Sequence, residues 1–166
     1  MHPLQKMLVR RGMTALLGVS AALARRRALW PLSRAWSHWL ARGTIRRRKI
    51  DQTSRQISDL GRAWQQGFPS PKQVPIEAVS ADTVFARIET PCPLRGSGDT
   101  AACWRMMEYD RAVVASAGGQ FVVLQSQAEP GVTSCRVALR LAGAGTGDLV
   151  PAHVRAPPPR GTETIS

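Results

Sequence analysis

Two side chains in the stretch TPCPLRGSGDTAACWRMMEYDRAV, residues 90–113, have types and positions that could do chemistry. Cys92 lies between two prolines in a loop just before a predicted helix, where the helix dipole and Arg95 would stabilise a thiolate. Asp110 lies inside that helix. A thiolate is a nucleophile and a carboxyl group moves protons, so Cys92 and Asp110 are the candidate catalytic residues.

The position of Asp110 is unusual because it falls on the apolar side of the helix predicted over residues 100–117. At about 100° per residue, Asp110 is centred among Cys103, Met107 and Val114. A buried carboxylate must be hydrogen-bonded, paired with a cation, or protonated with a raised pKa. Two interpretations therefore stand. Asp110 is a site residue, or it is a structural acid that accepts hydrogen bonds from the loop CPLRGSG, residues 92–98, and holds that loop shut.

The three cysteines exclude more kinds of site than they suggest. There is no CxxC pair, and the three histidines lie outside the predicted domain, at His2, His38 and His153. This pattern disfavours a zinc site, and the odd number of cysteines disfavours a disulfide scaffold, so we expect neither a metal nor a cofactor. Cys103 and Cys135 are either small buried hydrophobic residues or, with Met107 and Arg95, part of a ligand pocket.

The elements that position these residues follow from a change of periodicity at Asp82. The segment TVFARIE, residues 83–89, alternates as a half-buried strand does. After the helix, residues 120–127 and 133–141 form two further predicted strands joined by a short Pro-Gly turn, with Arg136 and Arg140 on the outward side. We expect an α+β domain over residues 76–142, with an antiparallel sheet of about three strands packed by one main helix.

The flanking segments differ from this domain in composition. Residues 1–49 contain twelve Lys or Arg and no acid, and so carry the whole formal net charge of +12. Residues 50–75 are predicted to hold a helix over 53–66 and then the proline-rich linker FPSPKQVP. Residues 143–166 are rich in Gly, Pro and Thr, which predicts a disordered tail.

The apolar run GMTALLGVSAALA, residues 12–24, is too short to span a bilayer as a helix. Arginines precede it, and ALA at residues 22–24 resembles a cleavage site, so a signal peptide is one interpretation. Arg25 to Arg27 follow at once and oppose export, while the acid-free, Arg-rich composition also suits a mitochondrial presequence. The location we expect is cytoplasmic with membrane association, and a targeting segment to an organelle or for export is the alternative.

The next segment, WPLSRAWSHWLARGTIRRRK, residues 30–49, predicts a basic amphipathic helix. Trp36 and Trp39 share an apolar face, and basic residues cluster at its end, at Arg46, Arg47 and Arg48. One interpretation is that the tryptophan face docks on the domain; another is that this face and the arginines contact an anionic membrane or an acidic partner. Nucleic acid is disfavoured, because no zinc finger, aromatic sheet motif or helix-turn-helix spacing accompanies the charge.

The order of motifs over residues 84–139 resembles the L-2-amino-thiazoline-4-carboxylic acid hydrolase family and, more distantly, vinyl-reductase-type small-ligand domains. The matching positions are Cys92-Pro93, Met107 through Asp110, and Gly131 through Cys135. The family pattern has a cysteine where this chain has Met107, and Cys103 lies one turn earlier. The resemblance implies a small-molecule ligand and hydrolytic opening of a thiazoline ring by cleavage of a C–N or C–S bond. The alternative is a non-catalytic accessory or binding module, held at a membrane or an acidic partner by residues 1–49.

Overall fold

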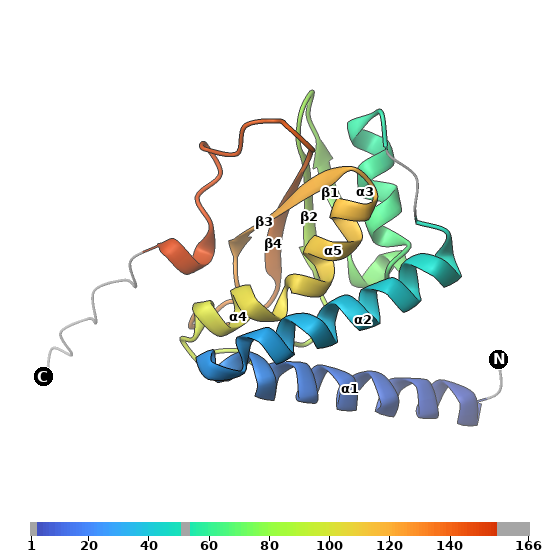
Figure 1. Cartoon of the computed structure of the whole chain (residues 1–166), viewed down its shortest axis with the longest axis vertical. Coiled ribbons are helices and arrows are strands. Elements are labelled where there is room, and N and C mark those ends of the chain that lie inside the picture. Colours follow the sequence, from blue (N-terminus) through green and yellow to red (C-terminus); the bar gives the residue numbers. More distant parts are fainter. Residues whose placement is uncertain (1–2, 51–53, 156–166) are drawn as a thin grey trace, which may run out of the picture.

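The computed structural model describes residues 3–50 and 54–155, with the backbone alone for residues 3–11 and 13 (Figure 1). The regular elements are α1 (Pro3–Arg25), α2 (Trp30–Arg48), α3 (Ile57–Gln65), β1 (Ile76–Val79), β2 (Val84–Ile88), α4 (Thr100–Met106), α5 (Glu108–Ser116), β3 (Gly119–Gln125) and β4 (Cys135–Leu141). Short 3-10 turns lie at residues 27–29, 71–73 and 152–154. The α+β class predicted from the sequence is confirmed.

The sheet is antiparallel and has four strands in the order β1-β2-β4-β3. Strands β3 and β4 form the predicted hairpin, in which Phe121 pairs with Leu139. The prediction of three strands is wrong by one, because β1 was missed. Its four residues, IEAV, are half-buried or exposed, so this edge strand lacks the alternation of apolar and polar side chains that identifies a half-buried strand.

The helices cover the sheet in successive layers. Helix α3 packs on β2 and β4, α5 packs on β3, and α2 crosses over α5. Helix α1 runs antiparallel to α2 as the outermost layer (Figure 1). The core between sheet and helices contains fully buried Leu60, Trp64, Val113, Val114 and Leu139.

The helix predicted over residues 100–117 is two helices. Asp99 is the N-cap of α4, and its carboxylate accepts a hydrogen bond of 2.7 Å from the Ala102 N–H. The chain leaves helical geometry at Met107, whose ψ is 11°, and α5 then begins. No proline or glycine marks this break in the sequence. Asp110 nevertheless faces inward, with 7% of its surface exposed.

Helix α2 packs on the domain mainly through small residues, and at its first residue the Trp30 ring contacts the Trp104 ring of α4 with their centroids 5.2 Å apart. Ser33, Ser37 and Ala41 are buried, whereas Trp39 is 64% exposed. Of the two interpretations of the face that holds Trp36 and Trp39, docking on the domain is therefore wrong for Trp39. Small side chains allow the closer approach between two helices, so the apolar stripe of the sequence remains on the outside. Among the described helices, none has the length and apolar character needed to cross a membrane.

The segment FPSPKQVP between α3 and β1, which was predicted as a linker, packs beside the core. The helix predicted over residues 53–66 corresponds to α3, and its first residue lies outside the described ranges. In the proline-rich stretch that follows, Val74 is fully buried and the Gln65 side-chain amide donates to its carbonyl at 2.8 Å. This stretch consequently has a fixed position beside the core.

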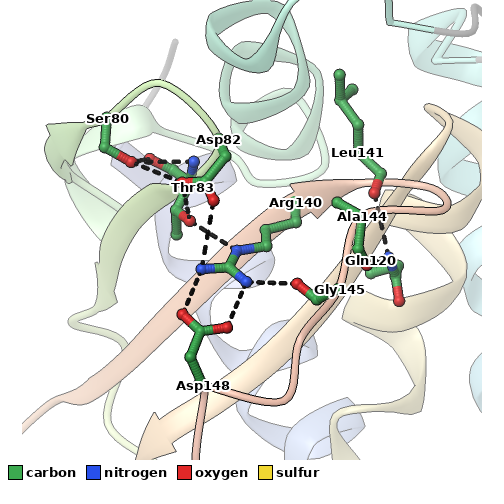
Figure 2. Close-up of polar contacts among 9 residues, drawn as sticks. All are labelled: Ser80, Asp82, Thr83, Gln120, Arg140, Leu141, Ala144, Gly145 and Asp148. Carbon is green, nitrogen blue, oxygen red and sulfur yellow. Dashed lines mark hydrogen bonds and ion pairs between the residues drawn. The ribbon is translucent and has the colours of Figure 1, made fainter.

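Residues 143–155 are also held in place, which corrects the prediction of a disordered tail over 143–166; residues 156–166 lie outside the described ranges. Figure 2 shows the cause. The Arg140 guanidinium makes two bonds of 2.6 Å with the Asp148 carboxylate, donates to Thr83 Oγ1 at 2.7 Å, and contacts the Gly145 carbonyl. Arg140 lies on the outward side as predicted, but it is buried beneath this segment.

Candidate functional site

A cavity of about 620 Å³ lies between the α1–α2 hairpin and the α+β domain. Four of the residues predicted to form a site line it together: Cys92, Met107, Asp110 and Cys135. They come from the loop before α4, the break between α4 and α5, helix α5 and strand β4. The hairpin contributes the opposite wall with Leu16, Leu17, Ser20, Ser37, Leu40, Thr44, Arg47 and Arg48. Arg95 and Cys103 do not line the cavity, but each contacts a residue that does: Arg95 contacts Gln127, and Cys103 contacts Cys135.

Asp110 is the buried acid of this cavity. Its Oδ1 accepts a 3.0 Å hydrogen bond from Trp64 Nε1, which lies on α3 and is fully buried. Burial raises the pKa of Asp110 to about 6, although the Trp64 hydrogen bond and the positive charge of Arg111 both oppose that rise. A carboxyl group with this pKa exchanges protons readily near neutral pH.

The interpretation of Asp110 as a clasp for the CPLRGSG loop is not supported, because Gln127 has that role. Gln127 is fully buried, and its Oε1 accepts hydrogen bonds from the Cys92 N–H at 3.1 Å and from Arg95 Nη2 at 2.7 Å. Its Nε2 donates to the carbonyls of Ile88 and Thr90. One amide therefore joins the end of β2 to the loop. The sequence did not predict this role of Gln127, because a single glutamine in a turn forms no motif or periodic pattern.

Cys92 does not have the lowered pKa that its sequence context suggested. Burial raises the pKa of the Cys92 thiol, and this effect exceeds the opposing ones of the Leu94 N–H, 3.4 Å from the sulfur, and of Arg95. Arg95 directs its guanidinium to Gln127 and the Thr133 carbonyl. Cys92 is therefore a neutral thiol at physiological pH.

Cys103 and Cys135 are both buried and form a pair, of which Cys135 belongs to the cavity wall. A hydrogen bond between the two thiols lowers the pKa of Cys103 and raises that of Cys135, and burial raises the latter further. The Gln127 N–H also donates to Cys135 Sγ at 3.3 Å. Of the two sulfur-bearing residues, Cys135 is the one that lines the cavity.

Tyr109 is a lining residue that the sequence did not identify. Its hydroxyl donates to the Gly67 carbonyl at 2.9 Å and lies 3.1 Å from Thr44 Oγ1 on α2. Burial raises the pKa of Tyr109, so the hydroxyl stays neutral. The phenol thus ties α5 to α2 and to the segment after α3, and it fixes the width of the cavity at this point.

The residues predicted to contact an anionic surface divide between two sides of α2. Arg47 and Arg48 line the cavity and reach solvent, while Trp39 and Arg46 lie on the exposed side of the helix. Trp36 is half-buried and donates to Ser20 Oγ on α1 at 3.1 Å. Membrane contact stays a prediction, and the exposed side is the part available for it.

No family model, no curated protein and no solved structure matches this chain. Within residues 3–50 and 54–155, no group of three or more His, Cys, Asp or Glu side chains has an arrangement that could hold a metal ion.

Proposed function

We propose that the protein binds a small heterocyclic molecule in this cavity and hydrolyses it, as the resemblance to the L-2-amino-thiazoline-4-carboxylic acid hydrolase family implies. One observation carries the proposal: the carboxyl group of Asp110 has a pKa of about 6 and lies in the wall of a cavity of small-molecule size. A solvated aspartate has a pKa near 3.9 and is a weak base at neutral pH. Burial gives Asp110 the basicity that proton transfer requires.

In the proposed reaction Asp110 acts first as a base and then as an acid. It takes a proton from a water molecule while the water oxygen bonds to the ring carbon between nitrogen and sulfur. The C–N or C–S bond of that carbon then breaks, and Asp110 returns the proton to the departing atom. The ring opens with the net addition of one water molecule, and Asp110 regains its starting state.

Cys92 serves in this proposal as an orienting group. Its raised pKa keeps it protonated, and a thiol is a weak nucleophile but can donate a hydrogen bond to a ring atom. The Gln127 amide holds the Cys92 backbone N–H at 3.1 Å and so fixes the thiol at the cavity wall. Replacing Cys92 is expected to weaken ligand binding more than it slows the chemical step.

The test is turnover of 2-amino-thiazoline-4-carboxylate, followed by chromatography of the ring-opened product. We expect Asp110→Asn to lower kcat by about 10² to 10⁴, the usual contribution of a general acid or base. Asp59→Asn is the matched control, because Asp59 is a half-exposed aspartate on α3 that pairs with Arg62 and does not line the cavity. Equal kcat values for wild type and Asp110→Asn would refute the proposed role of Asp110.

The second candidate is a binding module without catalysis. The observation that favours it is the raised pKa of Cys92, together with Met107 at the position of the family's helix cysteine. Calorimetry with the same compound separates the two candidates. Binding of the compound without any ring-opened product would favour the module, and absence of both binding and product would refute the ligand class.

A further inference from the structure

The side of the α1–α2 hairpin that faces away from the domain carries exposed apolar side chains. Trp39 is 64% exposed and Leu32 is 55% exposed on α2, and Val19 is 47% exposed on α1. The hairpin thus has two different sides. One lines the cavity, and the other presents apolar surface to solvent, which in a soluble domain usually marks an interaction site.

Cationic side chains accompany this apolar surface on α2. Trp39, Arg42 and Arg46 are spaced three and four residues apart, so they share one face of the helix, and all three are exposed. Neither Arg42 nor Arg46 forms an ion pair with any residue that the structure describes. Since residues 1–49 contain no acid, no charge within the hairpin neutralises them. These three residues, Trp39, Arg42 and Arg46, therefore form a strip along α2 that presents an aromatic ring and two cationic groups to solvent.

The tryptophan of the strip is held beside α1. The Trp39 ring stacks on the Trp36 ring with their centroids 5.4 Å apart, and Trp36 donates to Ser20 Oγ of α1 at 3.1 Å. Ser20 follows the exposed Val19 in the chain. The outward residues of α1 nearby are uncharged and exposed: Ala15, Gly18, Val19 and Ala22. Both helices run antiparallel (Figure 1), so this uncharged surface of α1 and the strip on α2 belong to adjacent parts of the hairpin.

We infer that this outer side of the hairpin docks on an anionic lipid membrane, with the helices lying along the surface. Lys and Arg are attracted to anionic headgroups, Trp is enriched at the level of the headgroups, and short apolar side chains enter the acyl boundary. Nucleic acid would account for the arginines but not for the exposed Leu32, Trp39 and Val19. This inference goes beyond the proposed hydrolysis, and it places the cavity on the protected side of a membrane-bound hairpin.

The test uses the full chain, because α2 buries Ser37 and Ala41 against the core and a truncated protein would lose that packing. Co-sedimentation is measured with vesicles of phosphatidylcholine alone and of phosphatidylcholine with phosphatidylglycerol, at low and high salt. Arg42→Gln combined with Arg46→Gln is compared with Arg55→Gln combined with Arg155→Gln. The second pair removes the same charge from exposed positions outside the hairpin.

We expect wild type to bind only the anionic vesicles, and more weakly as salt rises. The Arg42 and Arg46 pair of substitutions should weaken binding about 30-fold, the fold-change that corresponds to about 2 kcal/mol for two basic side chains at a membrane surface. The control pair should change it less than threefold. Subtracting the fluorescence spectrum of Trp39→Phe from that of wild type gives the emission of Trp39. This emission should shift to shorter wavelength when anionic vesicles are added.

Three results would overturn the inference. Equal losses for the two pairs of substitutions would show that net charge acts without a docking face. An unshifted Trp39 emission would show that the ring stays in water. If the protein binds a DNA or RNA duplex more tightly than it binds anionic vesicles, and if Trp39→Phe changes neither affinity, the arginines would be assigned to nucleic acid.

Discussion

Trp64 and Asp110 meet in the core, where Nε1 of the indole lies 3.0 Å from Oδ1 of the carboxyl group. Trp64 is fully buried, whereas Asp110 is 7% exposed and lines the cavity, so Asp110 joins the core to the cavity wall. The carboxyl group thus has an acceptor role in the fold in either protonation state, whereas only its ionised form is a base. Stability and proposed chemistry therefore depend on the same residue in different ways.

The pH dependence of stability should reveal the buried acid. The pKa of Asp110 is about 6 in the folded chain against an ordinary value of 3.8, so between these values the folded state binds a proton that the unfolded state has lost. Stability must then fall as pH rises from about 4 to 6 and stay lower above. Two pKa units correspond to about 3 kcal/mol.

The measurement is urea unfolding of wild type and Asp110→Asn from pH 4 to pH 8. Because the other titrating groups are common to both proteins, the difference between the two free energies of unfolding isolates Asp110. From pH 4 to pH 8 the free energy of unfolding of wild type should fall by about 2.5 kcal/mol relative to that of Asp110→Asn. A difference that is constant with pH would mean that Asp110 titrates normally.

Asp110→Leu should separate the hydrogen bond from the charge. At about pH 4.5 the wild-type carboxyl group is largely protonated, and leucine leaves the Trp64 N–H without its acceptor. We expect Asp110→Leu to be less stable than Asp110→Asn by about 1 to 3 kcal/mol, since asparagine keeps an acceptor oxygen. Unfolding of both variants at the same pH checks this. A leucine variant as stable as the asparagine variant would show that the indole finds another acceptor.

Much of the domain could be predicted because its signals are local. The change from period two to a helical period located the strands and α4–α5, and the apolar neighbours of Asp110 predicted its burial. The same argument misjudged α2, where Ser37 and Ala41 face the core and Trp39 does not. A hydrophobic pattern shows where apolar residues gather, but it does not say which side of a helix fits closely against another.

The parts of the site that were missed depend on contacts between distant segments. Gln127 lies 35 residues from Cys92, and Tyr109 lies 65 residues from Thr44. Neither pairing leaves a periodic or motif-like trace in one sequence. The lowered pKa expected for Cys92 failed for a related reason. The neighbouring Arg95 was visible in the sequence, but the burial that outweighs its charge comes from the tertiary structure.

Alkylation should show that Cys92 is a buried, neutral thiol. We expect the rate of reaction with iodoacetamide, followed by mass spectrometry of the Cys92 peptide, to rise only above the free-thiol pKa of about 8.5, because burial disfavours the thiolate. A rate that rises well below this pH would contradict the direction of the pKa shift and would restore Cys92 as a nucleophile.

Gln127→Ala should release the loop that carries Cys92. Without the amide, the Cys92 N–H and the Ile88 and Thr90 carbonyls lose a partner, and each unpaired buried group costs about 1 to 3 kcal/mol. We expect faster exchange of the Cys92 amide hydrogen and faster alkylation of Cys92 than in wild type. Gln120→Ala is the control, because the Gln120 side-chain amide donates hydrogen bonds to the carbonyls of Leu141 and Ala144 at the other end of the sheet. Equal alkylation rates in both variants would contradict the clasp.

Glu108 should prove to be one of the residues that hold α2 on the domain. Its carboxylate contacts His38 Nε2 at 3.0 Å and Arg34 Nε at 3.2 Å, both on α2, and Arg111 on its own helix. Burial would raise the pKa of Glu108, but the hydrogen bonds from His38 and Arg111 and the charge of Arg111 hold it below its usual value. The carboxylate is therefore ionised at neutral pH and available to both α2 side chains.

A double-mutant cycle of Glu108→Ala and His38→Ala measures this attachment. We expect a coupling energy of about 0.5 to 3 kcal/mol in urea unfolding at pH 7, because the two side chains are in direct contact. The cycle of Glu108→Ala with Arg46→Ala should give less than about 0.5 kcal/mol, since Arg46 is exposed and lies eight residues beyond His38, about 12 Å along α2. If both cycles give the same coupling, the carboxylate acts through the general positive charge of the hairpin, and α2 is held instead by the packing of its small residues and by the Tyr109–Thr44 hydrogen bond.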